Sequence, residues 1–164
     1  MPETQNQEAP MVLYLVQHAA ARSKEEDPAR DLTEKGREDI ERVAHHLKRL
    51  KVQVGQILHS GKTRARSTAT VLVKHLQPAA GISEAPGLAP LDVPGIWADR
   101  LAPMAEDLLL VGHLPHLGKL AALLMSGDQE KKVVNFQMGA AVRLRRMGVG
   151  QWAVDWMLTP ELIL

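Results

Sequence analysis

A continuous apolar run near the start of the chain ends at a histidine: Met11-Val12-Leu13-Tyr14-Leu15-Val16-Gln17-His18-Ala19. Unbroken apolar runs of this length are typical of strands that are buried on both faces of a parallel sheet. Two later runs are similar, and they lead into Arg64 and end at His113. Because ligands of open α/β sheets bind beyond the carboxyl ends of the strands, we expect His18, Arg64 and His113 to meet at one edge of a sheet. Two histidines and an arginine there suit an anion such as a phosphoryl group.

Helical and strand-like segments alternate along the chain. Thr33 is a suitable N-cap for the first helix, and Pro115 suits the first turn of the last one. Near the C-terminus, apolar and charged residues alternate on both sides of Gly148 and Gly150, which predicts a closing hairpin. The order predicts an α/β fold, a three-layer α/β/α sandwich in which helices cover a mostly parallel sheet. We expect strands at residues 11–16, 55–60 and 107–111 and near Ile82, helices within residues 34–50, 63–76 and 91–104 and from Pro115 onward, and the hairpin within residues 142–156.

Length and composition limit the classes of function. The 164 residues predict a single domain, residues 11–164, after a polar, disordered N-terminal tail, residues 1–10. A net charge of +1 gives no bulk attraction to nucleic acid or to an anionic membrane, and 3% aromatic residues are too few for base stacking. The absence of cysteine excludes disulfides and thiolate chemistry. With no apolar run long enough to cross a bilayer and no secretory pattern, we expect a cytoplasmic protein that binds neither nucleic acid nor membranes.

The segment Ser60-Gly61-Lys62-Thr63 is similar to the end of a nucleotide-binding P-loop. The complete motif needs a glycine at position 56, where this chain has Gln56, and Gly55 lies one residue too early. A strand is expected to fill this gap, so the sequence does not encode the loop that cradles a nucleotide. The segment can still present backbone amides to a single phosphate at a helix N-terminus.

Seven histidines are present, and His113 and His116 form a His-x-x-His pair that could bind a metal together with His18. Pro115 lies between the two, and no nearby carboxylate offers a further ligand, so we expect neither a metal nor another cofactor. His59 could face either the site or the core. The remaining histidines lie on expected amphipathic helices, where solvated or packed roles are usual: His45, His46 and His75.

Three segments together resemble the histidine phosphatase (phosphoglycerate mutase-like) superfamily. They are Val16-Gln17-His18-Ala19, Ser60-Gly61-Lys62-Thr63-Arg64-Ala65-Arg66-Ser67-Thr68-Ala69 and Val111-Gly112-His113-Leu114-Pro115. The order and spacing match from Met11 to about Val142, including the segment of residues 32–36 before the first expected helix. The short chain is most similar to the SixA-type phosphohistidine phosphatases. The resemblance implies a phosphoglycerate mutase-like fold with a minimal lid.

The resemblance also implies a role for each site residue. His18 would be the nucleophile and would become transiently phosphorylated. Arg64 would hold two phosphoryl oxygens in its planar fork, and a protonated His113 would donate to the same group. These cations would neutralise the anion without a metal. Further substrate-binding residues are expected around them: Gln17, Arg22, Ser60, Lys62, Gly112 and Leu114.

The first motif departs from the superfamily pattern at two positions. Members carry Arg-His-Gly where this chain has Gln17-His18-Ala19. A glutamine offers only a neutral amide donor, and losing one charged donor typically costs about 3 kcal/mol in the transition state, or roughly a hundredfold in rate. Ala19 adds a methyl group where backbone freedom is expected to matter. Arg22 and Lys62 are candidate substitutes for the missing arginine.

The expected substrate follows from the size of the chain. Residues 77–104 are too few to form much of a lid, so we expect an open site that suits a phosphate presented on a protein surface. We therefore predict a metal-independent phosphatase for phosphohistidine on a protein of the histidine phosphotransfer type. Two alternatives remain: a phosphate- or phosphoprotein-binding domain in which Gln17 has abolished turnover, and a phosphatase for small phosphate esters. No general acid stands out among the loop carboxylates Glu25, Glu26, Asp27, Asp31 and Asp92.

Overall fold

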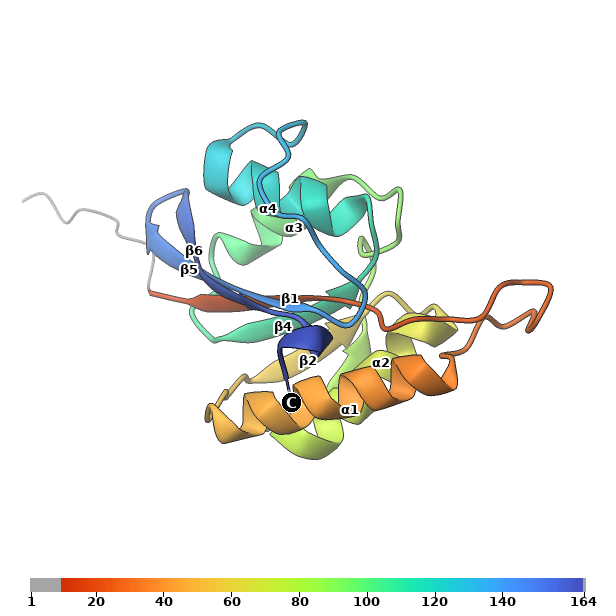
Figure 1. Cartoon of the computed structure of the whole chain (residues 1–164). Coiled ribbons are helices and arrows are strands. Elements are labelled where there is room, and N and C mark those ends of the chain that lie inside the picture. Colours follow the sequence, from red (N-terminus) through yellow and green to blue (C-terminus); the bar gives the residue numbers. More distant parts are fainter. Residues whose placement is uncertain (1–9, 164) are drawn as a thin grey trace, which may run out of the picture.

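The structure is a computed structural model that describes residues 10–163, so the tail expected at residues 1–10 lies outside it except for Pro10. Within the described residues, six strands form one sheet in the order β3-β2-β4-β1-β5-β6 (Figure 1). The first four strands of this order are parallel to one another, and the last two are antiparallel to their neighbours. The strands are β1 (Val12–Gln17), β2 (Gln56–His59), β3 (Ile82–Glu84), β4 (Leu108–Gly112), β5 (Ala141–Gly148) and β6 (Gln151–Leu158).

Helices cover both faces of this sheet, which confirms the α/β/α sandwich with a mostly parallel sheet. In Figure 1, α1 (Glu34–Arg49) and α2 (Thr63–Leu76) lie on one face, and α3 (Pro94–Leu101) and α4 (His116–Ser126) lie on the other. A short 3-10 helix, η1 (Pro160–Leu162), follows β6 and was not expected from the sequence. Among the described residues, no helix is both long and apolar enough to cross a membrane.

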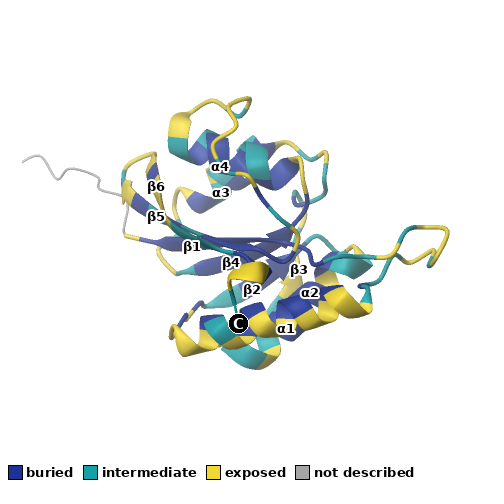
Figure 2. Ribbon diagram, viewed as in Figure 1, coloured by how far each residue is buried: buried dark blue, intermediate teal, exposed yellow. Residues whose placement is uncertain are grey.

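The apolar run in β1 is unbroken because both faces of this strand are covered. Tyr14 and Val16 belong to the core beneath α1 and α2, whereas Leu13 and Leu15 belong to the core beneath α3 and α4. All four side chains are at most 2% exposed. Figure 2 shows the same pattern for the whole molecule, with buried residues on the sheet and on the inner helix faces. Burial on two faces fixes the register of β1, because a slip of one residue would exchange its two sets of side chains.

The region expected to be too short for a lid contains little secondary structure. Between α2 and β4 the chain forms β3, a loop and the eight-residue helix α3. Pro94 begins this helix, so it is shorter than the expected window of residues 91–104. Trp97 and Leu101 are nearly fully buried beneath it, which places α3 in the helical layer and confirms the minimal lid.

The segment after β1 is held by a hydrogen bond to α2 and by the close approach of α1. The backbone N–H of Ala19 donates to Thr68 Oγ1 at 3.0 Å, and the same hydroxyl donates to the carbonyl of Arg64 at 2.8 Å. On the other side, a Cβ placed on Gly36 would lie 2.1 Å from the carbonyl oxygen of Ala20, so only glycine allows α1 to approach this closely. Thr33 caps α1 as expected, because its side chain accepts from the N–H of Gly36 at 2.9 Å. The segment after β1 is therefore held between α1 and α2.

Replacing Thr68 by valine should lower the free energy of unfolding by about 1–3 kcal/mol, because the buried N–H of Ala19 would lose its acceptor. Urea denaturation measures this loss. The matched control is Thr70→Val, since the exposed Thr70 hydroxyl makes the same kind of bond to the carbonyl of Arg66 at 2.8 Å but accepts no buried N–H. We expect the control to change stability by less than about 0.5 kcal/mol. Equal losses in both variants would contradict the argument.

Candidate active site

His18 lies directly beyond the carboxyl end of β1 and is 9% exposed. Its backbone N–H donates to the carbonyl of Gly112 at 3.0 Å, and its ring Nδ1 lies 2.8 Å from the carbonyl oxygen of Ala19. A carbonyl only accepts, so Nδ1 carries the hydrogen and Nε2 of the neutral ring keeps its lone pair. Burial lowers the pKa of His18, and the charges of Arg64 and Arg30 lower it further, against the opposing effect of the Ala19 bond. The ring is thus neutral near pH 7 and able to act as a nucleophile.

His113 follows β4, the parallel neighbour of β1, so the two histidines lie side by side. Their ring centroids are 5.1 Å apart. The side chain of His113 is 1% exposed, and its Nε2 lies 2.6 Å from Ser60 Oγ. Burial lowers the pKa of His113 to about 3, with further lowering by the charges of His18, Arg64, Lys62 and His116. The protonated His113 expected from the resemblance is therefore not the form of the free protein, in which the ring is neutral.

Arg64, the second residue of α2, places its guanidinium in this cluster. Its charge lowers the pKa of both His18 and His113. The Nε atom is buried without a hydrogen-bond partner, and no carboxylate pairs with Arg64 among residues 10–163. Burial and the charge of Arg30 lower the pKa of Arg64, but a guanidinium keeps its proton in proteins. The site therefore contains a fixed cation that its own protein does not neutralise.

Most of the expected substrate-binding residues gather around these three. Gln17 ends β1 opposite Gly112 of β4; the glutamine is 8% exposed and its Oε1 has no hydrogen-bond partner in the described chain. Ser60 bonds to the ring of His113, and Lys62 is the N-cap of α2 with a charge that acts on the same ring. Leu114 follows His113 and is 41% exposed at the rim.

The charges of two arginines in the loop after β1, Arg22 and Arg30, act on different groups. The charge of Arg22 lowers the pKa of Asp31, whereas the charge of Arg30 lowers the pKa of both His18 and Arg64. Both arginines occupy the loop after β1, and nothing in their spacing separates them. The isolated bridge between Ala21 and Leu32 folds this loop back, which only tertiary structure reveals.

Ala19 does not disturb the backbone where the superfamily has glycine. It is fully buried, and the non-glycine residues with positive φ in the described part of the chain are Arg30, Lys51 and Gln77. The position therefore does not require the conformational freedom of glycine, and the expected cost of this substitution is absent.

The loop carboxylates are engaged in holding their own loops. Burial alone would raise the pKa of Asp31, but hydrogen bonds from Ser67 and from the N–H of Leu32, together with nearby arginine charges, lower it overall. Asp27 accepts from two backbone N–H groups, and Asp92 accepts from that of Ala89 at 2.9 Å. A carboxylate with a lowered pKa is a poor general acid, so Asp31 is not suited to that role.

The P-loop and metal alternatives gain no support from the geometry. Strand β2 occupies residues 56–59, where a P-loop would need its curved phosphate cradle. Among the described residues, no three histidine, aspartate or glutamate side chains gather closely enough to hold a metal ion. His116 is 1% exposed, and both of its ring nitrogens lack a hydrogen-bond partner in this part of the chain.

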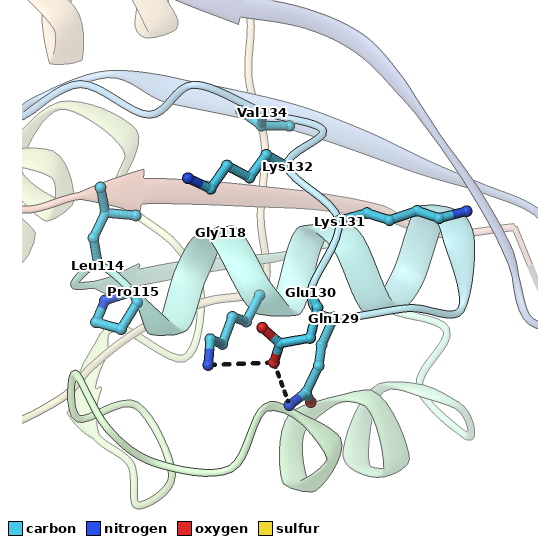
Figure 3. A pocket seen from close by; sticks show the side chains of 9 residues that line it. Leu114, Pro115, Gly118, Gln129, Glu130, Lys131, Lys132 and Val134 are labelled. Carbon is cyan, nitrogen blue, oxygen red and sulfur yellow. Dashed lines mark hydrogen bonds and ion pairs between the residues drawn. The ribbon is translucent and has the colours of Figure 1, made fainter.

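A hollow of about 250 Å³ lies beside the cluster and begins at Leu114, the residue after His113. Figure 3 shows Lys131 and Lys132 with their amino groups pointing away from Glu130, which forms an ion pair beside the hollow. In this pair, Lys119 Nζ lies 3.5 Å from Glu130 Oε1. The further lining residues are Pro115, Gly118, Gln129 and Val134. A lysine-rich, partly apolar surface thus adjoins the site.

Comparison with known proteins identifies the family. Residues 13–109, more than half of the chain, match the model of the histidine phosphatase superfamily (branch 1). The chain belongs to the histidine phosphatase superfamily. Its membership and its fold support phosphatase activity, as the three motifs around His18, Arg64 and His113 predict.

Relatives within the superfamily include proteins of similar length. The phosphohistidine phosphatase SixA of Escherichia coli strain K12 is 26% identical over 155 residues, which are 92% of this chain and 94% of SixA. An uncharacterized protein of Picosynechococcus sp. is 34% identical over 148 residues, which cover 85% of this chain and 82% of that protein.

Solved structures confirm the fold. The protein histidine phosphatase SixA in complex with tungstate superposes with a TM-score of 0.81 at 25% identity, over 93% of this chain and 99% of that chain. A phosphoglycerate mutase from Bacillus anthracis shares the fold with a TM-score of 0.68 at 12% identity, over 90% of this chain and 92% of the mutase. The expected similarity to the superfamily and its phosphoglycerate mutase-like fold is thus confirmed.

Titration with sulfate should shift the ring NMR signals of His18 and His113 together, because one anion would contact both rings. The exposed His45 on α1 provides an internal control whose signals should stay constant. A response from only one of the two site histidines would show that they do not share an anion.

The affinity for sulfate should rise as the pH falls from 8 to 5, a range in which sulfate keeps its charge. The pKa values of His18 and His113 are lowered in the free protein, and a bound anion would raise both of them. Binding would then be linked to proton uptake, which acidic pH favours. Calorimetry in buffers of different ionisation enthalpy measures the protons directly. An affinity independent of pH would mean that both rings stay neutral beside the anion.

Proposed function

We propose that this protein is a phosphatase that works through a phosphohistidine at His18, and that its substrate is phosphohistidine on another protein. The observation that carries the proposal is the orientation of His18. The Ala19 carbonyl holds Nδ1–H, so the lone pair of Nε2 is available beside Arg64 and His113. A neutral imidazole in a cluster of cationic and hydrogen-bonding groups has the properties of a nucleophile for a phosphoryl group.

In the first step, the lone pair of His18 Nε2 attacks phosphorus, and the bond from phosphorus to the leaving nitrogen of the substrate histidine breaks. The electron pair of that bond remains on the substrate imidazole, which takes a proton from solvent. Arg64 stabilises the charge on the phosphoryl oxygens during transfer. His18 Nδ1–H stays bound to the Ala19 carbonyl throughout, which keeps the ring aligned and stabilises the phosphorylated imidazole.

In the second step, water attacks the phosphorus of phospho-His18 and the P–N bond breaks. His18 Nε2 regains its electron pair, phosphate leaves, and the proton of the attacking water passes to phosphate or solvent. His113 is neutral before substrate binds, because its pKa is about 3, and the incoming anion favours its protonation. Once protonated, Nε2 can donate to a phosphoryl oxygen in place of its bond to Ser60.

Phosphohistidine is the substrate that suits this site best. Its leaving imidazole needs little help from a general acid, and the loop carboxylates Asp27, Asp31 and Asp92 are occupied with backbone or side-chain hydrogen bonds. The minimal lid suits a phosphate on a protein surface, such as that of a histidine phosphotransfer domain. Similarity to the phosphohistidine phosphatase SixA of Escherichia coli over most of both chains supports the same choice.

The second candidate is a phosphate- or phosphoprotein-binding domain without turnover, and Gln17 favours it. The amide at this position is neutral, and its buried Oε1 is an acceptor that has no partner within the described chain. Such a domain would bind the anion through Arg64 without reaching the rate that a second charged donor provides. Hydrolysis of a small phosphate ester is the third possibility, and the assay below separates all three.

His18→Ala should abolish turnover of a phosphorylated histidine phosphotransfer domain, and Arg64→Ala and His113→Ala should each reduce kcat/KM by about a hundredfold or more. Brief reaction followed by denaturation at neutral pH should trap an acid-labile phosphoenzyme in the natural protein and none in His18→Ala. An aryl phosphate, with and without chelator, serves as the small-substrate comparison. Sulfate binding without any phosphoenzyme would favour the binding domain. Turnover by His18→Ala that a chelator abolishes would indicate metal-activated water instead.

A further inference from the structure

We propose that two adjoining hollows at the start of α4 form one docking surface, which binds an apolar and acidic segment of the phosphorylated protein. The residues that carry the argument are Leu91, Val93, Leu114, Pro115, Lys131 and Lys132, and we call them the α4 surface. This inference rests on the proposed function, because it adds to His18 a place for the protein that presents the phosphohistidine.

A second hollow, of about 170 Å³, lies next to the hollow that begins at the end of β4. Leu91 and Val93, which precede α3, line this second hollow. Pro115, Lys119 and Gln129 line both hollows, so the two are continuous across the start of α4. Only a short turn separates α4 from β4, and the continuous surface therefore borders the active site.

Large apolar side chains are exposed on the α4 surface. Leu91 is 88% exposed, Val93 62% and Leu114 41%. Exposed apolar side chains that gather beside a site are typical of surfaces that bind another protein. By contrast, the loop after β1, residues 20–31, contains no apolar side chain larger than those of alanine and proline. We therefore expect the apolar contact with a protein substrate on the α4 side of the site.

Positive charge lies beside these apolar side chains. Lys131 and Lys132 are exposed, and no carboxylate pairs with either of them within residues 10–163. Figure 3 shows the amino group of Lys132 extending on the side of Leu114, whereas that of Lys131 extends the opposite way. Leu114 directly follows His113, so Lys132 is directed toward the end of the hollow that adjoins the active site.

The acidic residues of the two hollows are already engaged. Glu130 Oε1 lies 3.5 Å from Lys119 Nζ, and a carboxylate oxygen of Asp92 accepts the N–H of Ala89 at 2.9 Å. The two lysines of the α4 surface therefore keep their charges available for a partner. Acidic side chains on that partner complement them.

A protein that presents phosphohistidine to His18 must also cover the surroundings of the site, because a standard interface buries on the order of 800 Å² on each partner. Apolar contacts typically lie at the centre of such an interface, and charged contacts lie at its rim. The α4 surface has this order, with Leu114 next to His113 and Lys131 extending away from it. We therefore expect the substrate segment to carry an apolar side chain close to its phosphohistidine and acidic side chains farther out.

Two phosphohistidine peptides of equal length test the charge complementarity. Both carry leucines beside the phosphohistidine, and they differ only in outer residues that are aspartates in one and lysines in the other. Lys132→Glu should raise the KM of the acidic peptide about fivefold, because one attraction is replaced by a repulsion. Its kcat/KM for an aryl phosphate should stay within about twofold, since that substrate does not reach the hollow. The matched control is Lys48→Glu, which reverses an exposed charge on α1, on the other face of the sheet.

The apolar part of the α4 surface has its own matched pair of variants. Val93→Ser should raise the KM of the acidic peptide about fivefold, because burial of the valine side chain against the peptide is lost. Serine is a favourable N-cap, and Val93 is the N-cap of α3, so the fold should be retained. Val149→Ser is the control: Val149 is 59% exposed in the turn between β5 and β6, and its loss should leave the KM unchanged. Thermal melts of all variants check the fold.

The natural protein should prefer the acidic peptide, and 0.5 M salt should weaken this preference. Equal kcat/KM values for the two peptides would overturn the α4 surface. Losses in Lys48→Glu and Val149→Ser as large as those in Lys132→Glu and Val93→Ser would overturn it as well.

Fluorescence anisotropy of a labelled acidic peptide separates docking from catalysis. It is measured on His18→Ala with and without Lys132→Glu, so that no peptide is consumed. If the natural protein hydrolyses neither peptide, the proposed function fails, and weaker binding caused by Lys132→Glu would still support the α4 surface. Hydrolysis of both peptides at equal rates, or no detectable binding, would refute the α4 surface alone.

Discussion

The parallel pairing of β1 with β4 is the contact on which the site depends. Gln17 lies opposite Gly112 in this ladder, and the N–H of the next residue, His18, continues it by donating to the Gly112 carbonyl at 3.0 Å. The two histidines therefore leave the sheet side by side. Alternate side chains of β1 are buried in two separate cores. A slip of one residue would place each set of side chains in the other core, so the register is fixed. The same apolar packing that stabilises the fold thus fixes the distance between the rings of His18 and His113.

Around this pairing the protein concentrates positive charge and leaves it uncompensated. Arg30, Arg64 and Lys62 come from separate segments, and their charges act on His18, on His113 or on both.

Because His113 is buried and neutral, the free energy of unfolding depends on pH. A folded pKa near 3 against an unfolded value near 6.5 means that His113 binds fewer protons when folded, so its contribution to stability declines as the pH falls through this interval. An anion bound beside His113 would favour its protonated form and so oppose that loss.

Local signals in the sequence were sufficient for most of the fold and for the centre of the site. The apolar runs predicted β1, β2 and β4, the periodicity predicted α2 with its observed ends, and Thr33 predicted the start of α1. These features depend on neighbours along the chain, which a sequence displays directly. The same is true of His18 and His113, because the carboxyl ends of adjacent parallel strands meet at one edge.

The features that sequence analysis missed depend on contacts between distant segments. Arg30 gains its position from the Ala21–Leu32 bridge and the Asp31–Ser67 bond, neither of which has a sequence signature. Arg146 is another case: it follows the inward-facing positions of β5, is 3% exposed, and donates to the carbonyl of Leu101 at the end of α3 at 2.9 Å. Both arginines take roles set by the acceptors or charges that folding places around them. A sequence shows which residues carry charge, but the fold decides which groups that charge acts on, as Arg30 shows by lowering the pKa of both His18 and Arg64.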